Sequence, residues 1–337
     1  MNILSIDGGG IRGIIPGQIM VSFEKKLKIL SGNEQMRIAD VFDLIAGTST
    51  GGILSCLYLC PDSEDRSRPR FSAQDAVDLY LQNGDDVFDV SVFKEISSIG
   101  GLGDEKYSAE NLEELLNRYF EDMKLSDLLK PCLVTAYDIT RRKAHFFNTD
   151  DIVNGPSEQD FFLRDIARAT SAAPTYFEPT NIVASDRTVY PLIDGGVFAN
   201  NPTMCACIEA FKMNPEVRIK DLKILSVGTG IISNAYHYSE AKNWGKISWL
   251  SPILDIFMSG VSETVHCQLE NLFRCAECTP QYLRLEVNLK EYSDVDGAMD
   301  NASEKNMDAL QRAAIKFVED DTVSQKLDDF IRLLLAE

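Results

Sequence analysis

Apolar and polar positions alternate along the chain in two patterns. Short apolar runs end in turns rich in glycine, and longer segments between them carry apolar residues every three or four positions. The short runs predict strands over residues 2–6, 41–46, 132–139, 144–147, 188–193, 222–227 and 282–287. The helical period predicts helices over residues 16–30, 52–59, 72–81, 108–119, 161–170, 202–213, 244–275, 303–318 and 322–335. Strands that alternate with helices predict an α/β fold with a largely parallel sheet covered on both faces.

No internal repeat or low-complexity linker interrupts this alternation. A chain of 337 residues is long enough for one large α/β domain or two small ones. The unbroken alternation favours a single domain over residues 1–337. Two stretches lack a period. Residues 61–70 are polar and predict a surface loop, and residues 84–106 hold four glycines and predict a long loop or lid.

The composition narrows the classes of partner. Apolar residues make up 45% of the chain, which is enough for a sizeable core. The 33 basic and 52 acidic residues give a net charge of −19. This charge argues against nucleic acid as a partner and against long-range attraction to anionic membranes, and it favours solubility.

The first residues, the lengths of the apolar runs and the cysteines indicate where in the cell the protein is expected. Residues 1–6 lack a basic region and run directly into a glycine loop, so we expect no signal peptide. No apolar run reaches the length of a membrane span, so we expect no transmembrane segment. Eight cysteines are scattered through mostly apolar segments. We interpret them as reduced thiols of a cytosolic protein.

The first candidate for chemistry is the stretch Gly-Thr-Ser-Thr-Gly at residues 47–51, with Ser49 at its centre. It lies between a predicted strand and a predicted helix, the context of a nucleophile elbow. Gly47 and Gly51 leave space where the strand and the helix cross, because neither carries a Cβ atom. The helix that follows directs its unpaired N–H groups towards the serine. The pattern predicts a catalytic serine.

A glycine loop, Gly-Gly-Gly-Ile-Arg-Gly at residues 8–13, follows the first strand and has three interpretations. It fits the dinucleotide-binding fingerprint of a nicotinamide-dependent oxidoreductase. It fails as a phosphate-binding P-loop, because Ile14 and Ile15 stand where Lys and Ser or Thr are needed. It also fits an oxyanion hole, in which successive backbone N–H groups hold a negative oxygen. Loops at the carboxyl ends of parallel strands share one crevice with Ser49, which favours the third interpretation.

A serine nucleophile needs a base, and the chain has three histidines, His145, His237 and His266. None of them ends a predicted strand at the expected crevice. Asp194 does end an apolar strand, and two glycines follow it. A carboxylate with a pKa of about 3.9 is a weak base at neutral pH, but burial raises that pKa. A Ser49–Asp194 dyad is therefore one interpretation, and a turn-forming role for Asp194 is the other.

Three further signals favour structural roles. Cys275 and Cys278, with His266 and Cys267 upstream, have zinc-site spacing, but buried thiols at a helix end are the favoured interpretation. The apolar run from Trp244 to Met258 could face lipid or form part of a cyclic-nucleotide switch, whereas such runs are more often core. The basic triplet at residues 141–143 is interpreted as a solvated hairpin turn and not as a phosphate site.

Taken together and in order, the loop at residues 7–13, the elbow at residues 47–51 and the Asp-Gly-Gly turn at residues 194–196 resemble the patatin-like phospholipases. Further similar stretches are Ala-Ala-Pro-Thr-Tyr-Phe at 172–177, Ser-Val-Gly-Thr-Gly at 226–230 and Met-Asp-Asn-Ala-Ser at 299–303. The resemblance covers about residues 1–310, and the helices over residues 303–335 are expected to pack on that region.

The resemblance implies a three-layer α/β/α sandwich with a mostly parallel central sheet. It implies a lipid acyl hydrolase of the phospholipase A or lysophospholipase type that uses no metal or other cofactor. Ser49 is then the nucleophile, Asp194 its base, and Gly47 and Gly51 the glycines of the elbow. The residues implied for the oxyanion hole are Gly8, Gly9, Gly10, Arg12 and Gly13. Arg12 fills the arginine position of the family loop, where it either steers a lipid phosphate or ties the loop to a carboxylate.

The implied substrate is a membrane phospholipid or galactolipid at the bilayer surface, and a homo-oligomer is left open. Plant storage-type members carry a secretory leader, whereas this chain begins on its first strand, so we expect a cytoplasmic protein that acts peripherally on membranes. Bacterial members serve as injected toxins or as antiphage effectors switched on by cyclic nucleotides, and the missing leader is compatible with both roles. The main alternative from another class is a non-catalytic lipid- or nucleotide-binding module on the same fold.

Overall fold

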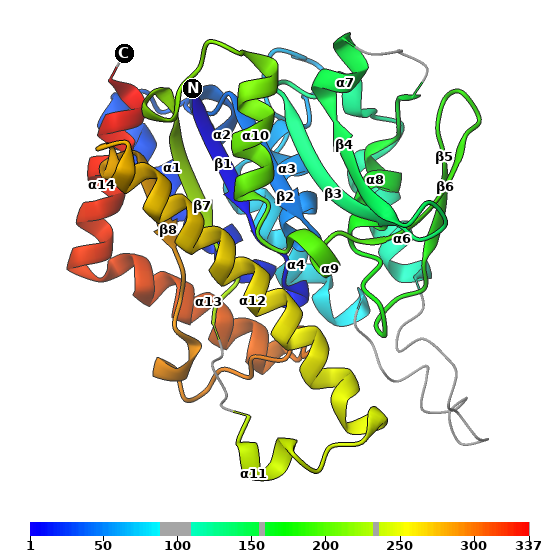
Figure 1. Cartoon of the computed structure of the whole chain (residues 1–337). Helices are drawn as coiled ribbons and strands as arrows, with labels where there is room; N and C mark the ends of the chain where they lie inside the picture. The colour runs from blue at the N-terminus through cyan, green and yellow to red at the C-terminus, as the bar shows by residue number, and fades with distance from the viewer. Residues whose placement is uncertain (88–108, 155–158, 232–235, 337) are drawn as a thin grey trace.

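The computed structural model describes residues 1–87, 109–154, 159–231 and 236–336. Eight strands form one sheet in the order β5-β6-β3-β2-β1-β7-β8, with β4 paired to β3 (Figure 1). The strands are β1 Asn2–Ile6, β2 Leu44–Thr48, β3 Cys132–Asp138, β4 Lys143–Asn148, β5 Thr180–Val183, β6 Val189–Asp194, β7 Lys223–Val227 and β8 Tyr282–Leu285. The five strands from β3 to β8 along this order are mutually parallel, and β4, β5 and β6 are antiparallel additions.

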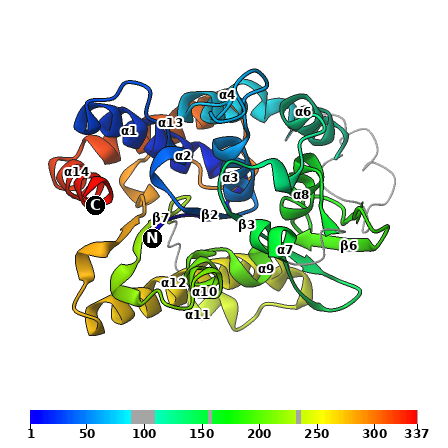
Figure 2. The same cartoon turned by 90° about the horizontal axis from the view of Figure 1, so that it is seen from above.

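Helices cover both faces of the sheet, as Figure 2 shows from above: α1, α3, α4, α6 and α8 lie on one face and α9, α10 and α12 on the other. The α-helices are α1 Ile14–Ser31, α2 Ile38–Val41, α3 Thr50–Leu59, α4 Ala73–Val87, α6 Glu110–Phe120, α7 Thr149–Asn154, α8 Leu163–Thr170, α9 Gly196–Ala199, α10 Thr203–Met213, α11 Tyr238–Ala241, α12 Lys246–Cys275, α13 Glu304–Glu319 and α14 Asp321–Leu335. The predicted α/β/α sandwich with a mostly parallel sheet is confirmed.

The sheet separates two apolar layers because side chains alternate along each strand. Leu4 and Ile45 belong to the large core that includes Phe23 of α1. Their neighbours Ile3 and Leu44 belong to the second core, together with side chains of α10 and α12. Strands buried on both faces are apolar at consecutive positions, which is why β1 and β2 appear in the sequence as mainly apolar runs and not as alternating ones.

The C-terminal helices pack against α1. The Lys26 ammonium lies 2.7 Å from a carboxylate oxygen of Asp328 in α14. Gln311 of α13 donates a hydrogen bond to the side-chain oxygen of Gln18 at 3.0 Å. These two helices therefore pack on α1.

β6 approaches the centre of the sheet in a way that the sequence pattern did not predict. β3 pairs with β2 as far as Thr135, which lies opposite Thr48, and with β6 from Ala136, which lies opposite Asp194. Because β6 is antiparallel to β3, its carboxyl end meets the carboxyl end of β2 from the opposite direction. Asp194 thus reaches the end of the Ser49 strand, as expected, but on an antiparallel strand.

Some predicted boundaries need correction. α4 continues to Val87, so Gly84 lies in a helix and does not open a loop. A Cβ at Gly84 would collide with the side chains of Ile11 and Met307, so glycine permits close packing there. The rest of the loop or lid expected up to residue 106 lies outside the described residues. The pattern also missed β5, α7 and α9, which are short. No helix in the described ranges has the length and apolar character needed to span a membrane.

Candidate active site

Ser49 occupies the turn between β2 and α3, with φ 55° and ψ −125°. This is a strained conformation for a residue other than glycine and costs about 1–3 kcal/mol. The turn is held by neighbouring groups. The Ser49 N–H donates to the Thr170 hydroxyl at 2.8 Å, and that hydroxyl donates to the Thr135 carbonyl at 2.7 Å. The serine is therefore fixed by α8 and β3 as well as by its own turn.

The two glycines of the elbow are required by close backbone approach. A Cβ at Gly47 would collide with the backbone of Gly51 and Gly52, where the chain folds back from the strand into the helix. A Cβ at Gly51 would collide with the backbone carbonyl of Ile6 at the end of β1. The spacing of glycines around Ser49 thus follows from the packing of α3 onto β1 and β2.

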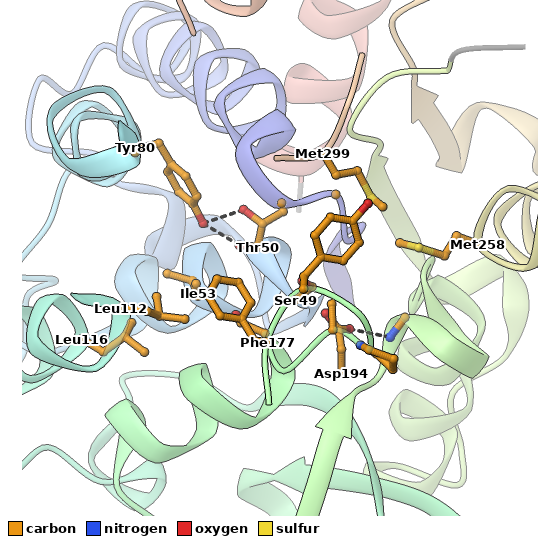
Figure 3. A pocket seen from close by; sticks show the side chains of 18 of the residues that line it. Ser49, Thr50, Ile53, Tyr80, Leu112, Leu116, Phe177, Asp194, Met258 and Met299 are labelled. Atoms are coloured by element: carbon orange, nitrogen blue, oxygen red, sulfur yellow. Dashed lines mark hydrogen bonds between the residues drawn. The ribbon is translucent and has the colours of Figure 1, made fainter. Parts of the chain in front are cut away.

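Asp194, at the end of β6, is only 3% exposed and lies beside Ser49 (Figure 3). The Gly196 N–H donates to Asp194 Oδ1 at 2.6 Å, and the Ser49 hydroxyl lies near enough to the carboxylate to favour its charged form. Burial raises the pKa of Asp194 to about 7, and the Gly196 N–H and the nearby Ser49 hydroxyl oppose this effect. In the described part of the chain no lysine or arginine forms an ion pair with this carboxylate. Its proton affinity therefore suits proton transfer near neutral pH.

The glycine loop presents two backbone donors to the same space. Gly9 and Gly10 line the cavity that contains Ser49, and Gly10 has a left-handed φ of 60°. Across the described ranges the N–H groups of these two glycines have no hydrogen-bond acceptor. The Gly8 N–H is already used, because it donates to the Asn200 carbonyl at 3.0 Å. Within the described ranges, Gly9 and Gly10 are therefore the residues of this loop whose N–H groups remain candidates for an oxyanion hole.

The other two loop residues have packing roles. A Cβ at Gly13 would collide with the Thr50 hydroxyl, so this glycine permits contact between the loop and α3. Arg12 Nη1 donates to the Gly230 carbonyl at 3.2 Å, and Arg12 is not among the residues that line the cavity. Burial lowers the pKa of Arg12, and Glu286 opposes this effect. Arg12 thus ties the loop to the segment after β7 through a carbonyl, and not through the carboxylate that was considered.

A buried ion pair holds the other end of the loop. Asp7, at 2% exposed, accepts two hydrogen bonds from Arg284 of β8, Nη1 to Oδ1 at 2.8 Å and Nη2 to Oδ2 at 2.6 Å. Arg284 also pairs with Glu286, whose carboxylate accepts the Gly230 N–H at 2.8 Å. The sequence interpretation missed Arg284. The available signal was a single charged residue between two leucines of a predicted strand.

The cavity above Ser49 has a volume of about 330 Å³ and is almost entirely apolar. Its walls come from α3, α4, α6, α12 and the segments around Phe177 and Met299 (Figure 3). The apolar side chains include Ile53, Leu79, Leu112, Leu115, Leu116, Phe177, Phe257, Met258 and Met299. Ser49 and Asp194 both line this cavity, so a hydroxyl and a carboxylate face the same apolar space. The arrangement can accept an apolar chain and act on a polar group at its end.

The three histidines lie elsewhere. His145 packs among the aromatic rings of Phe147, Phe161 and Tyr190, and burial lowers its pKa to about 4. His266 shares a hydrogen bond of 2.9 Å with the Tyr282 hydroxyl. His237 precedes α11, and none of the three lines the cavity. The carboxylate thus remains the candidate base.

The cysteines with zinc-site spacing do not form a metal-binding cluster in the described part of the structure. Cys267 and Cys275 are exposed, and Cys278 is partly buried. Within the described ranges, no three His, Cys, Asp or Glu side chains are grouped so that they could hold a metal ion.

Fold and site together define an α/β/α protein in which a nucleophile-elbow turn opens on an apolar cavity. A family model described as patatin-like phospholipase matches residues 4–206. Patatin-like protein 1 of Arabidopsis thaliana is 34% identical over 363 aligned residues, covering 100% of this chain and 86% of that protein. Patatin-like protein 4 of the same plant is 31% identical, covering 98% and 86%. The chain therefore belongs to the patatin-like phospholipase family.

A solved structure is also similar, but more distantly. VipD from Legionella pneumophila matches with a TM-score of 0.33 and 12% identity, over 94% of this chain and 66% of that one. This likeness is too low to add to the argument. Family membership supports a lipid acyl hydrolase activity in general, in preference to an oxidoreductase that uses the glycine loop.

Proposed function

We propose that the protein hydrolyses fatty-acyl esters of membrane glycerolipids, as a phospholipase A or lysophospholipase, through a Ser49–Asp194 dyad. The observation that carries this proposal is the contact between the Ser49 hydroxyl and the buried Asp194 carboxylate at the floor of an apolar cavity. Burial supplies what a solvent-exposed aspartate lacks, a pKa near that of an effective general base.

The reaction begins when Ser49 Oγ attacks the ester carbonyl carbon and Asp194 accepts the hydroxyl proton. The carbonyl oxygen becomes an oxyanion, and the N–H groups of Gly9 and Gly10 hold it. The bond from carbon to the alcohol oxygen then breaks, Asp194 returns its proton to the leaving alcohol, and an acyl-serine remains. Water repeats the sequence with the same base and releases the fatty acid.

Two features support this assignment of roles. The strained Ser49 turn projects the hydroxyl into the cavity, and the donors of the glycine loop are held by contacts at both ends of the loop. Such preorganised donors need no rearrangement as charge develops, and loss of one typically costs about 10²–10³ in rate. The apolar walls fit a fatty-acyl chain, and they offer little to a polar acyl group.

The test is Ser49→Ala, assayed on p-nitrophenyl esters and by lipidomics of a membrane extract. We expect turnover to fall by about 10³-fold or more while the protein stays folded, because the nucleophile is lost. Ser22→Ala is the matched control, since Ser22 lies in α1 and contacts the Gln18 carbonyl. Turnover that survives in Ser49→Ala would disprove the mechanism. An inactive wild type that still binds lipid would instead indicate a non-catalytic binding module.

The same lipidomics assay can include cyclic nucleotides, with wild type and Ser49→Ala in parallel. A rise in turnover of the wild type alone would identify an activator. The products formed would also distinguish a phospholipid from a galactolipid substrate.

A further inference from the structure

Exposed aromatic and aliphatic side chains are concentrated on α11 and the first half of α12. Tyr238 is 81% exposed and Phe257 is 54% exposed, values that are unusual for large apolar groups. We call this surface the aromatic rim and define it by Tyr236, Tyr238, Trp244, Trp249, Ile256 and Phe257. Both tryptophans of the chain belong to it.

The aromatic rim is an organised cluster and not a scatter of single residues. The rings of Tyr236 and Trp244 lie edge to face with centroids 5.4 Å apart, and those of Trp244 and Trp249 with centroids 5.0 Å apart. The Tyr236 hydroxyl donates to an Asp255 carboxylate oxygen at 2.9 Å. These contacts connect the segment before α11 to α12, so the exposed rings are held in one arrangement.

The rim is continuous with the cavity. Phe257 is exposed and also lines the cavity, and Met258 beside it lines the cavity as well. Figure 1 shows α11 and the start of α12 projecting on the side of the sheet where β1 and β2 have their carboxyl ends, which is the side of Ser49. Phe257 therefore stands at the entrance through which a substrate would reach Ser49.

The charge of this segment differs from that of the whole chain. Residues 236–258 contain two acidic and two basic residues, whereas the chain carries −19. The acidic and basic residues are Glu240, Asp255, Lys242 and Lys246. A locally neutral surface can approach an uncharged or zwitterionic membrane without repulsion, but has no basic cluster to attract an anionic one.

We propose that the aromatic rim docks on a zwitterionic lipid bilayer and places the cavity entrance at the membrane surface. Tyr and Trp are favoured at membrane interfaces, because their rings are apolar and their polar atoms stay hydrated. The choice of a bilayer as the occupant rests on the proposed function. A protein seated on Phe257 would cover the entrance to the cavity, whereas a bilayer in the same place would supply the substrate.

The two tryptophans make the test direct, because all tryptophan emission comes from the rim. The probe is vesicles of dialkyl-ether phosphatidylcholine, which contain no acyl ester to hydrolyse. We expect vesicles to shift the emission to shorter wavelength and to protect it from acrylamide quenching. Unchanged emission and quenching at saturating lipid would overturn the proposal.

A double variant tests the residues without removing a fluorophore or a cavity residue. Tyr238→Ser with Ile256→Ser should weaken vesicle affinity by about tenfold or more, because two exposed apolar groups no longer enter the interface. The matched control is Ile29→Ser with Ile208→Ser, which removes two exposed isoleucines from α1 and α10. Equal affinity for the two double variants would also overturn the proposal.

Kinetics separates this proposal from the proposed function. The rim variant should lose turnover of ester-linked phosphatidylcholine vesicles but keep turnover of soluble p-nitrophenyl butyrate. An inactive wild type whose emission still shifts with vesicles would reject the hydrolase proposal and support docking. Sedimentation should show one oligomeric state for wild type and rim variant. Self-association that the rim variant abolishes would overturn docking in favour of a second copy as the occupant.

Discussion

The ends of β1 and β6 carry the same three residues, Asp-Gly-Gly, but the two aspartates have different surroundings. Asp7 and Asp194 are both almost fully buried. Arg284 occupies both carboxylate oxygens of Asp7, whereas in the described part of the chain Asp194 has no cationic partner and accepts the Gly196 N–H beside the Ser49 hydroxyl. The motif therefore does not decide the role of either residue. The neighbour that faces each carboxylate decides it.

The pKa shifts of Asp7 and Asp194 also have different opposing causes. Burial raises the pKa of both, to about 6 for Asp7 and to about 7 for Asp194. The positive charge of Arg284 opposes the effect of burial at Asp7, while the Gly196 N–H and the nearby Ser49 hydroxyl oppose it at Asp194. One carboxylate is thus engaged in holding the glycine loop, and the other is available to accept a proton.

The largest expected effect comes from Asp194→Asn. It should lower ester turnover by about 10²–10⁴-fold, because the amide cannot accept the Ser49 proton. The unfolding free energy at pH 8 should not fall, since the neutral amide avoids the cost of a buried charge and can still accept the Gly196 N–H. Turnover and chemical denaturation measured on the same preparation test both parts. If Asp194→Asn retains turnover, Asp194 is not the base. If it unfolds, Asp194 has a structural role like that of Asp7.

For Asp7→Asn we expect the main loss in stability and not in the chemical step. It leaves the Arg284 charge with Glu286 alone, and breaking a buried pair in this way typically costs about 3–5 kcal/mol of stability. Denaturant unfolding gives this quantity. Asp7→Asn with Arg284→Met is the control, because removing both charges should restore part of the lost stability. An Asp7→Asn protein as stable as wild type would show that the ion pair does not anchor the loop.

A pH profile should show the smallest effect. Below pH 7 the kcat/KM for a soluble ester should fall about tenfold per pH unit, because Asp194 must be ionised to act as base, and it should level off above pH 7. Such a midpoint would ordinarily suggest a histidine. The variant His145→Gln, His237→Gln, His266→Gln is therefore the control, and it should keep the same midpoint. Loss of the midpoint in that variant would transfer the role of base to a histidine.

The same pKa has an opposite consequence for stability. The folded pKa of Asp194 lies above its ordinary value of 3.8, so its contribution to stability is complete below about pH 4 and is lost as the pH rises through 7. Activity and this part of the stability therefore change in opposite directions over the same range of pH.

Local features of the site were predictable from the sequence. The glycines around Ser49 mark a crossing of strand and helix that leaves no room for a Cβ, and this need is visible in five residues. Asp194 could be found because it ends an apolar run before two glycines. The parallel core of the sheet was also predictable, since strands buried on both faces are apolar at most positions.

Long-range partners were not predictable. Arg284 meets Asp7 across 277 positions, and Thr170 meets the Ser49 N–H across 121. The antiparallel direction of β6 is set by its pairing with the last residues of β3, and residues 188–193 alone do not reveal it. For the run from Trp244 to Met258 the sequence favoured core over a lipid-facing surface, because an amphipathic period does not distinguish a face against the protein from a face against another medium.

The pairing along β3 also joins parts of the site that lie far apart in the sequence. The serine turn lies between β2 and α3, near the start of the chain. The Thr170 hydroxyl that holds it belongs to α8, and the carboxylate beside it belongs to β6, which pairs with Ala136 of β3. A nascent chain that extends no further than β4 therefore carries the serine without either group. For the same reason, the return of esterase activity during refolding would report the arrival of β6.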